Sequence, residues 1–288
     1  MHLVKMHGCG NDYVFVDTIG GPGLPEDTDV NRLAVQLSDR HFGVGGDGLI
    51  LIERRPSGRL GMRMFNADGS EGEMCGNGMR CLAAYCFGEG YVMDTRFEVE
   101  TLAGVIAPVV TPEPGERRVA SVTVDMGPPR EVTPGVVVAL PRKAGGPPGP
   151  SESPPSFRGT FVSMGNPHFV ITLPDVEDID IAGVGPLLER HPAFPSGANI
   201  EFVNVLSPEG LRMRVWERGS GVTLACGTGA SAAVVATATG GLTGRRVTVV
   251  ADGGDLEVEW AREGPVLVTG PAEEVFRTKY SKAIPRRR

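Results

Sequence analysis

The sequence has no run of apolar residues approaching the roughly 20 that a membrane-spanning helix needs. It also lacks a charged start followed by a long apolar segment, so we expect no signal peptide and a cytoplasmic location. Aromatic residues make up only 6% of the chain, and 28 Lys and Arg residues face 35 Asp and Glu residues, for a net charge of −7. Neither nucleic acid nor a membrane is therefore expected as a partner.

Patterns typical of metal sites and disulfide frameworks are missing as well. The five cysteines are an odd number without a Cys-x-x-Cys pair, and the five histidines are scattered without a His-Glu-x-x-His pattern. We expect reduced thiols and no metal site. No recognisable anchor for a pyridoxal group is present, so we expect chemistry without a cofactor.

What the sequence does contain is a pattern that occurs twice. Cys75 and Cys226 each begin a stretch of the form Cys-Gly-polar-Gly, followed by small and apolar residues suited to a helix. The two cysteines are 151 residues apart, and so are the aromatic residues ten positions before them, Phe65 and Trp216. A strand, a Gly/Ser turn and a helix with cysteine at its N-terminus are therefore predicted twice.

The length of 288 residues allows two ordinary domains. A second repeated feature supports a duplication, because the strand, Gly-Asn turn and strand around Asn11 recur around Asn166. We predict an α+β fold of two pseudo-symmetric domains, each a mostly antiparallel sheet or barrel around a central helix. The domains are expected over 1–114 plus 271–288 and over 115–270.

Four helices are predicted, with strands between them, the first from apolar residues at helical spacing and two from the small and apolar residues that follow Cys75 and Cys226. The helices are expected over 31–42, 77–88, 179–190 and 228–239. The glycine-rich residues 43–48 precede a strand rather than a helix, so we interpret them as a turn and not as a phosphate site. Residues 112–116 are interpreted as the crossing between domains, and the Pro-, Gly- and Ser-rich residues 141–156 as an exposed loop or insertion.

A cysteine at a helix N-terminus lies at the positive end of the helix dipole, which favours the thiolate. The adjoining glycines let a ligand carboxylate approach the backbone. If the two halves face each other, one sulfur could remove a proton from an α-carbon while the other delivers a proton to the opposite face. The remaining cysteines, Cys9, Cys81 and Cys86, are interpreted as small buried hydrophobic residues.

Taken together, these segments resemble the diaminopimelate epimerases, a family of cofactor-independent two-cysteine racemases. The matching segments are 5–12, 65–70, 75–81, 163–168, 198–200, 217–219, 225–229 and 269–271. The resemblance implies the conversion of LL-2,6-diaminopimelate to meso-diaminopimelate by a thiol/thiolate mechanism, in lysine and peptidoglycan precursor biosynthesis. It also implies that a C-terminal strand returns to the first domain.

The resemblance further implies the site residues. Cys75 and Cys226 are the implied catalytic pair, with His168 and Glu217 tuning the pKa values of the thiols. The implied substrate-binding residues are Asn11, Asn66, Gly76, Asn77, Asn166, Asn199, Glu217, Arg218, Gly227 and Thr228. Backbone N–H groups at 76, 77, 227 and 228 would hold the reacting carboxylate, and Arg218 suits the distal carboxylate. One departure is Gly48, where some members have Gln.

Two alternatives stay open. A proline or hydroxyproline racemase would have the same fold, but in that group the residue after the first Cys-Gly is typically His, and here it is Asn77. A thiol-redox or binding protein would need only one reactive cysteine. The sequence does not decide which cysteine is the resting thiolate, nor the oligomeric state, for which a homodimer is one alternative.

Overall fold

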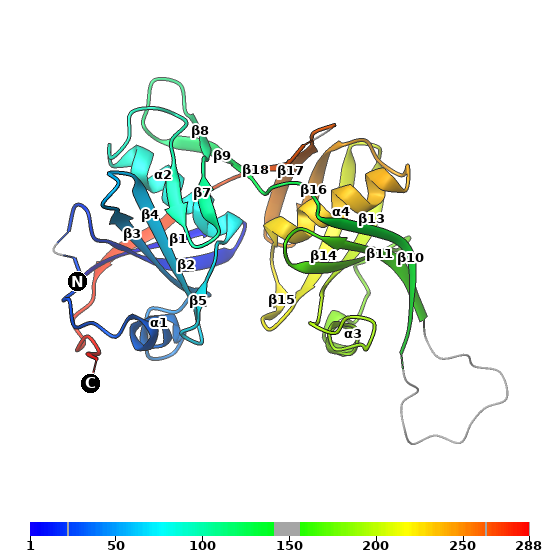
Figure 1. Ribbon diagram of the computed structural model, residues 1–288, viewed down its shortest axis with the longest axis horizontal. Coiled ribbons are helices and arrows are strands. Elements are labelled where there is room, and N and C mark those ends of the chain that lie inside the picture. The colour runs from blue at the N-terminus through cyan, green and yellow to red at the C-terminus, as the bar shows by residue number, and fades with distance from the viewer. Residues whose placement is uncertain (22, 141–155, 263, 288) are drawn as a thin grey trace, which may run out of the picture. The chain divides into compact units, whose positions relative to one another are not determined.

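The computed structural model describes residues 1–21, 23–140, 156–262 and 264–287. They form two compact units, Met1–Asp125 with Val268–Arg288 and Met126–Leu267 (Figure 1). No helix within the described ranges is long and apolar enough to cross a membrane. The loop predicted over 141–156 lies outside the described residues except for Ser156.

The first unit is built on a mixed sheet with the strand order β19-β1-β2-β3-β4-β6-β7, and β5 pairs with β4. A hairpin of β8 and β9 also belongs to this unit. Its elements are β1 (His2–Gly8), β2 (Asn11–Asp17), α1 (Val30–Ser38), β3 (Gly48–Arg54), β4 (Leu60–Asn66), β5 (Glu71–Gly72), α2 (Gly76–Gly88), β6 (Val99–Thr101), β7 (Gly104–Ile106), β8 (Val109–Pro112), β9 (Val119–Asp125) and β19 (Glu273–Lys279).

The second unit has the strand order β10-β11-β12-β13-β14-β16-β17-β18, and β15 pairs with β14. The last of these strands, β18, carries the chain back to the first unit. The elements are β10 (Glu131–Ala139), β11 (Ser156–Ser163), β12 (Pro167–Thr172), α3 (Ile181–Glu189), β13 (Asn199–Ser207), β14 (Gly210–Glu217), β15 (Gly221–Thr223), α4 (Gly227–Thr239), β16 (Arg246–Ala251), β17 (Gly254–Trp260) and β18 (Val266–Gly270).

The two units repeat one pattern of strand pairing. In the first, β2-β3-β4-β6 are joined in parallel, antiparallel and parallel fashion. In the second, β12-β13-β14-β16 follow the same sequence of pairings. The predicted α+β fold of two pseudo-symmetric domains is therefore confirmed.

The boundaries of the units differ from those expected of the domains. The chain leaves the first unit after Asp125 and re-enters it at Val268. The expected crossing at 112–116 instead lies at the turn of the β8–β9 hairpin, where Glu113 N donates to Arg118 O at 2.8 Å. The expected division into two functional halves, 1–114 plus 271–288 and 115–270, stays a prediction.

The helices α2 and α4 are buried on nearly all sides. Every residue of α2 from Gly76 to Phe87 is buried, and so are ten of the 13 residues of α4. A helix without a solvated face belongs inside a core, and small residues such as Ala83 and Ala233 let strands approach it closely. Figure 1 shows each helix lying among the strands of its own unit. These are the predicted central helices, and the two cysteines lie at their starts.

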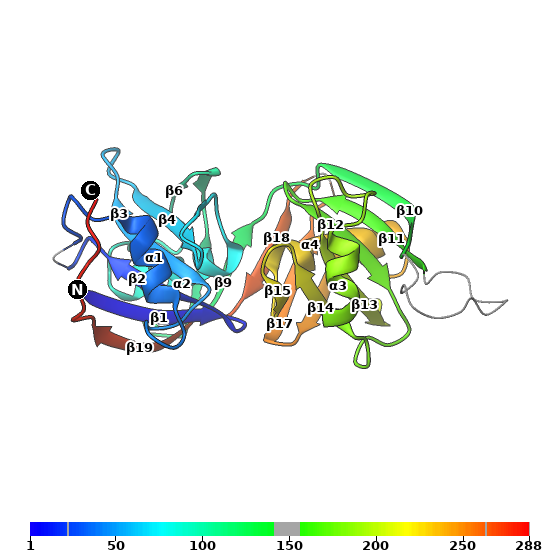
Figure 2. The same ribbon diagram turned by 90° about the horizontal axis from the view of Figure 1, so that it is seen from below.

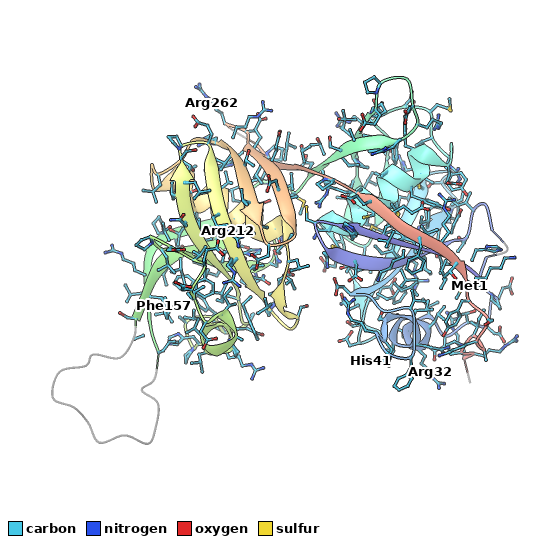
Figure 3. All side chains as sticks on the ribbon, turned by 180° about the vertical axis from the view of Figure 1, so that it is seen from behind. Met1, Arg32, His41, Phe157, Arg212 and Arg262 are labelled. Carbon is cyan, nitrogen blue, oxygen red and sulfur yellow. The ribbon has the colours of Figure 1, made fainter. Side chains whose placement is uncertain are left out.

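The shorter helices α1 and α3 pack on strands of their own units (Figure 2). The sequence-based prediction for the first was too long, because α1 ends at Ser38 rather than continuing to residue 42. The carboxylate of Asp39 accepts hydrogen bonds from the N–H groups of His41 and Phe42, which draws the chain into a turn. As a result His41 lies at the surface (Figure 3), and Phe42, the last residue of the predicted helix, is 77% exposed.

Local residue patterns did not predict four of the strands. β5 and β15 have only two and three residues, and β10 buries few of its side chains. In β19 all seven residues are exposed, so no apolar alternation marks it, and it is held by antiparallel pairing with β1. It is the C-terminal strand that the resemblance expected to return to the first domain.

An ion network joins β1, β2 and the turn after α1. Lys5 Nζ lies 2.5 Å from Asp12 Oδ2, and Arg40 Nη2 lies 2.7 Å from Asp12 Oδ1. Burial acts to raise the pKa of Asp12, but hydrogen bonds from Arg40 and Lys5 outweigh it and lower that pKa to about 2. The carboxylate therefore stabilises the folded state at neutral pH.

We predict a pH dependence of stability that belongs to Asp12. Its contribution is fully present above the unfolded pKa of about 3.9 and is lost as the pH falls through about 2. Urea unfolding should show that the unsubstituted chain loses about 2 kcal/mol more than Asp12→Asn between pH 5 and pH 2. Equal losses in the two proteins would contradict the assignment.

Candidate functional site

Cys75 and Cys226 have the same local structure. Cys75 (φ −129°, ψ 125°) caps the N-terminus of α2, and its sulfur accepts a hydrogen bond from Gly78 N at 3.5 Å. Cys226 (φ −126°, ψ 118°) caps α4, and its sulfur accepts from Gly229 N at 3.4 Å. The first N–H groups of a helix have no partner within it and lie at its positive end. Each unit thus places a sulfur beside a helix start suited to bind an anion.

The second glycine of each pattern is closely packed. A Cβ at Gly78 would lie 2.5 Å from Ile50 Cδ1 on β3, and a Cβ at Gly229 would lie 2.8 Å from Glu201 Oε1 on β13. A larger residue at either position would therefore require a neighbouring side chain to shift.

In the first unit, Asn11 and Asn77 meet Cys75. Asn11 Oδ1 accepts a hydrogen bond from Asn77 Nδ2 at 3.1 Å and lies 3.6 Å from Cys75 Sγ, which donates to it. Asn66 is engaged in its own turn, where its Nδ2 donates to Ser70 Oγ at 2.9 Å. The substrate-binding role implied for Asn66 stays a prediction.

Asp47 is a residue of this unit that the sequence-based reasoning missed. Its Oδ2 accepts from Asn11 Nδ2 at 2.7 Å and from Asp12 N at 3.0 Å, and its Oδ1 accepts from Arg40 Nη2 at 2.9 Å. Burial raises the pKa of Asp47, the charge of Asp12 also raises it, and Arg40 lowers it. The glycine-rich turn that contains Asp47 is therefore connected to Cys75 through Asn11.

In the second unit, Asn166 and Thr228 take the places of Asn11 and Asn77. Asn166 Nδ2 donates to Thr228 Oγ1 at 3.2 Å, and that hydroxyl lies 3.4 Å from Cys226 Sγ. On its other side, Asn166 Oδ1 lies 3.0 Å from His168 Nε2. His168 thus reaches Cys226 through two intervening side chains.

His168 contacts Glu201, the second residue that the sequence-based reasoning missed. Its Nδ1 lies 2.7 Å from Glu201 Oε1, and both side chains are 0% exposed. Glu201 Oε2 has no hydrogen-bond partner among the described residues. A buried carboxylate is costly unless it is paired, so the imidazole and the carboxylate hold each other in place.

Cys226 lies in a strongly perturbed electrostatic environment. Burial raises its pKa well above the usual value, and the carboxylates of Glu217 and Glu201 raise it further. Hydrogen bonds with the Thr228 hydroxyl and the Gly229 N–H act in the opposite direction. Burial and the two carboxylates therefore favour the thiol form of Cys226 over the thiolate.

Glu217 belongs to the same cluster. Burial raises its pKa, a hydrogen bond from Thr223 lowers it, Glu201 raises it, and a hydrogen bond with Cys226 lowers it. The predicted tuning pair is thus divided in this unit: Glu217 touches Cys226, whereas His168 contacts Asn166. The tuning role itself stays a prediction for both.

The loop after β14 carries Arg218. Its backbone N–H donates to Asn199 Oδ1 at 3.0 Å, and Asn199 Nδ2 donates to Pro167 O at 2.9 Å. Asn199 therefore holds this loop against β12 with both ends of its amide. The exposed guanidinium of Arg218 uses Nη1 to bond Ser196 O at 2.8 Å, and the hydrogen bonds of the described residues leave Nε and Nη2 for a ligand.

The predicted site residues fall into two groups, one in each unit. The first group is Asn11, Asn66, Cys75, Gly76 and Asn77, and the second is Asn166, His168, Asn199, Glu217, Arg218, Cys226, Gly227 and Thr228. Signals for the two missed residues were present in the sequence. Glu201 is a lone charge in the apolar run Ile200–Val203, and Asp47 is a lone charge among glycines.

A cavity of about 570 Å³ in the first unit contains none of these residues. Its lining includes Tyr85, Glu89, Arg117 and Arg277, and the last of these pairs with Glu89 at 2.7 Å. Arg117 donates to the carbonyl oxygens of Phe87 and Val92. The charged groups of the cavity are thus largely satisfied by protein, so we do not place the chemistry there.

Other parts of the described chain show no alternative centre. No group of three or more His, Cys, Asp or Glu side chains in the described ranges could hold a metal ion. The charged cluster around Arg212 on β14 (Figure 3) is an ion-pair network, in which Arg212 binds Glu177 at 2.6 Å and also contacts Asp252. The start of the central helix therefore remains the candidate functional position in each unit.

Comparison with known proteins gives a consistent result along nearly the whole chain. The family model described as diaminopimelate epimerase matches residues 3–132 and 160–275. A diaminopimelate epimerase of Pelotomaculum thermopropionicum is 50% identical over 288 residues, covering 97% of this chain and 99% of that protein. One from Moorella thermoacetica is 49% identical, covering 96% and 98%.

Solved structures with lower sequence identity share the fold. A PhzF-family phenazine biosynthesis protein of Bacillus anthracis superposes with a TM-score of 0.70 at 14% identity, covering 98% of this chain and 99% of that one. A hydroxyproline epimerase of Agrobacterium vitis, with trans-4-hydroxy-L-proline bound, gives 0.64 at 17% identity, covering 96% and 91%. At such identities the likeness concerns the fold alone.

Proposed function

The chain belongs to the diaminopimelate epimerase family, and from this we propose that it converts LL-2,6-diaminopimelate to meso-diaminopimelate without a cofactor. The observation that carries the proposal is the matched geometry of Cys75 and Cys226. Each cysteine caps a helix start, and the two have nearly the same backbone angles. The acid and the base of the reaction can therefore both be cysteine sulfurs. Inversion of a carbon centre needs such a pair, one on each face.

The proposed reaction is a proton exchange at the α-carbon. The thiolate of one cysteine takes the α-proton as the C–H bond breaks, and the electron pair passes into the α-carboxylate. The thiol of the other cysteine then donates its proton to the opposite face, so the charges of the two sulfurs are exchanged after each turnover. Because the reaction is reversible, each sulfur serves as acid in one direction and as base in the other.

The helix starts would stabilise the intermediate. The carboxylate gains negative charge as the α-proton leaves, and we propose that the N–H groups at Gly76, Asn77, Gly227 and Thr228 bind it. Preorganised donors of this kind act most strongly on charge that develops during the reaction. This replaces the electron sink that a cofactor would otherwise supply.

The second charged end of the substrate is assigned to Arg218. Its unused Nε and Nη2 can form the paired hydrogen bonds that a carboxylate accepts from a guanidinium. Asn199 fixes the backbone from which this side chain extends. A proline racemase acting on its smaller substrate would leave this charge without a counter-ion, which favours the diaminopimelate reaction.

The cellular setting is part of the proposal. We place the enzyme in the cytoplasm, in the synthesis of lysine and peptidoglycan precursors, with diaminopimelate as its small-molecule partner. A homodimer is compatible with the proposal but is not required by it, because each group of site residues lies within one chain. Sedimentation of the purified protein decides between a monomer and a dimer.

The first test concerns the two thiols. Cys75→Ala and Cys226→Ala should each lower the kcat for epimerisation by about 10³-fold or more, since an acid or base contributes roughly 10²–10⁴ and inversion needs both. The assay follows loss of LL-diaminopimelate and uptake of deuterium at the α-carbon in deuterated water. Cys86→Ala, a buried cysteine outside the site, serves as the matched control and should retain turnover. Normal turnover by either single variant would rule out the two-base scheme.

The second test concerns specificity. Arg218→Met should lower kcat/KM for diaminopimelate by about 10²-fold or more, the size expected when a charged hydrogen-bonded pair loses one partner. Arg246→Met changes another exposed arginine of the same unit and should have little effect. The unsubstituted protein should act poorly on lysine and proline, which lack the distal carboxylate. Equal rates on proline and diaminopimelate would contradict the proposed substrate.

A further inference from the structure

The amide of Asn11 is held at both ends. Its Nδ2 donates to Asp47 Oδ2 at 2.7 Å, while its Oδ1 accepts from Asn77 Nδ2 at 3.1 Å and from Cys75 Sγ at 3.6 Å. An amide can be turned so that either end faces a given neighbour. The groups around Asn11 therefore decide whether Cys75 meets an acceptor or a donor.

Asp47 favours the orientation in which the Asn11 amide nitrogen faces the carboxylate of Asp47. Its oxygens accept hydrogen bonds from three donors, Asn11 Nδ2, Asp12 N and Arg40 Nη2. Turning the Asn11 amide would bring its oxygen against this carboxylate and its nitrogen against Asn77 Nδ2. The contact with the carboxylate would be repulsive, so the observed orientation is the one that Asp47 supports.

The equivalent amide in the second unit is held by a different kind of group. Asn166 Oδ1 lies 3.0 Å from His168 Nε2, and an imidazole nitrogen can be either donor or acceptor. In that unit the amide nitrogen, rather than the oxygen, points toward the side of the cysteine, by way of Thr228. The two amides therefore have opposite polarity, and the carboxylate of Asp47 accounts for the difference in the first unit.

We propose that Asp47 is a positioning residue for the reaction, which locks the Asn11 amide with its oxygen toward Cys75. The proposal rests on the proposed function. An acceptor beside the sulfur favours the protonated thiol over the thiolate. This hydrogen bond therefore stabilises Cys75 in the protonated form, in which it delivers a proton to the α-carbon when it serves as the acid. The same oxygen also stays available to a substrate ammonium group.

The test compares two variants in one background. Arg40→Met removes the ion pair to Asp47 but leaves Asn11 its acceptor. In this background, Asp47→Asn keeps an acceptor oxygen for Asn11, whereas Asp47→Leu removes it at similar volume. The rate of iodoacetamide labelling at pH 7 is measured for each cysteine by peptide mapping, without substrate, and kcat and KM are measured separately with diaminopimelate.

We expect Asp47→Leu to speed the labelling of Cys75 by about 2- to 10-fold, the size of one neutral hydrogen bond. Labelling of Cys226, in the other unit, should not change. The kcat should fall about 10-fold, and Asp47→Asn should keep both the labelling rate and kcat within about threefold of the Arg40→Met protein.

Three results would overturn the proposal. The first is that Asp47→Leu changes neither the labelling rate of Cys75 nor kcat, and the second is that Asp47→Asn is as impaired as Asp47→Leu. The third is labelling of the buried Cys81 or Cys86, which would mean that α2 has opened. Failure of the proposed function is separable from all three. It would appear as absence of turnover in the unsubstituted protein, while the labelling comparison needs no substrate.

Discussion

Two helices that begin inside the core, each capped by a cysteine, are the constraint on which the structure depends. A buried helix start must satisfy its own N–H groups, bind a ligand there or pay a desolvation cost. Here the sulfurs of Cys75 and Cys226 satisfy one N–H group each, and the others are placed to receive a carboxylate. The surrounding strands, the close-packed glycines and the buried carboxylates all serve to hold these two positions.

The two units share a backbone but differ in the polar groups behind the sulfur. In the first, a carboxylate network of Asp12, Asp47 and Arg40 supports Asn11. In the second, the pair of His168 and Glu201 supports Asn166. A duplicated scaffold can therefore give two chemically similar thiols different surroundings, as a reaction with one acid and one base requires.

The sequence predicted those parts of the structure that local patterns encode. The four helices and the duplication followed from apolar periodicity and from the repeated Cys-Gly-polar-Gly stretch, because both are properties of neighbouring residues. β19 could not be found in this way, since its pairing with β1 provides its order and none of its residues is buried. The end of α1 depended on hydrogen bonds of Asp39, and Glu201 and Asp47 gained their roles only through partners distant in sequence.

The central claim is that Cys75 and Cys226 act on opposite faces of one α-carbon. The most direct measurement is a crystal structure of the protein with diaminopimelate bound. The account predicts both sulfurs within about 3–3.5 Å of the same α-carbon, one on each face, with its carboxylate at the two helix starts. A bound substrate with only one sulfur near the α-carbon, or with both sulfurs on the same face, would contradict it.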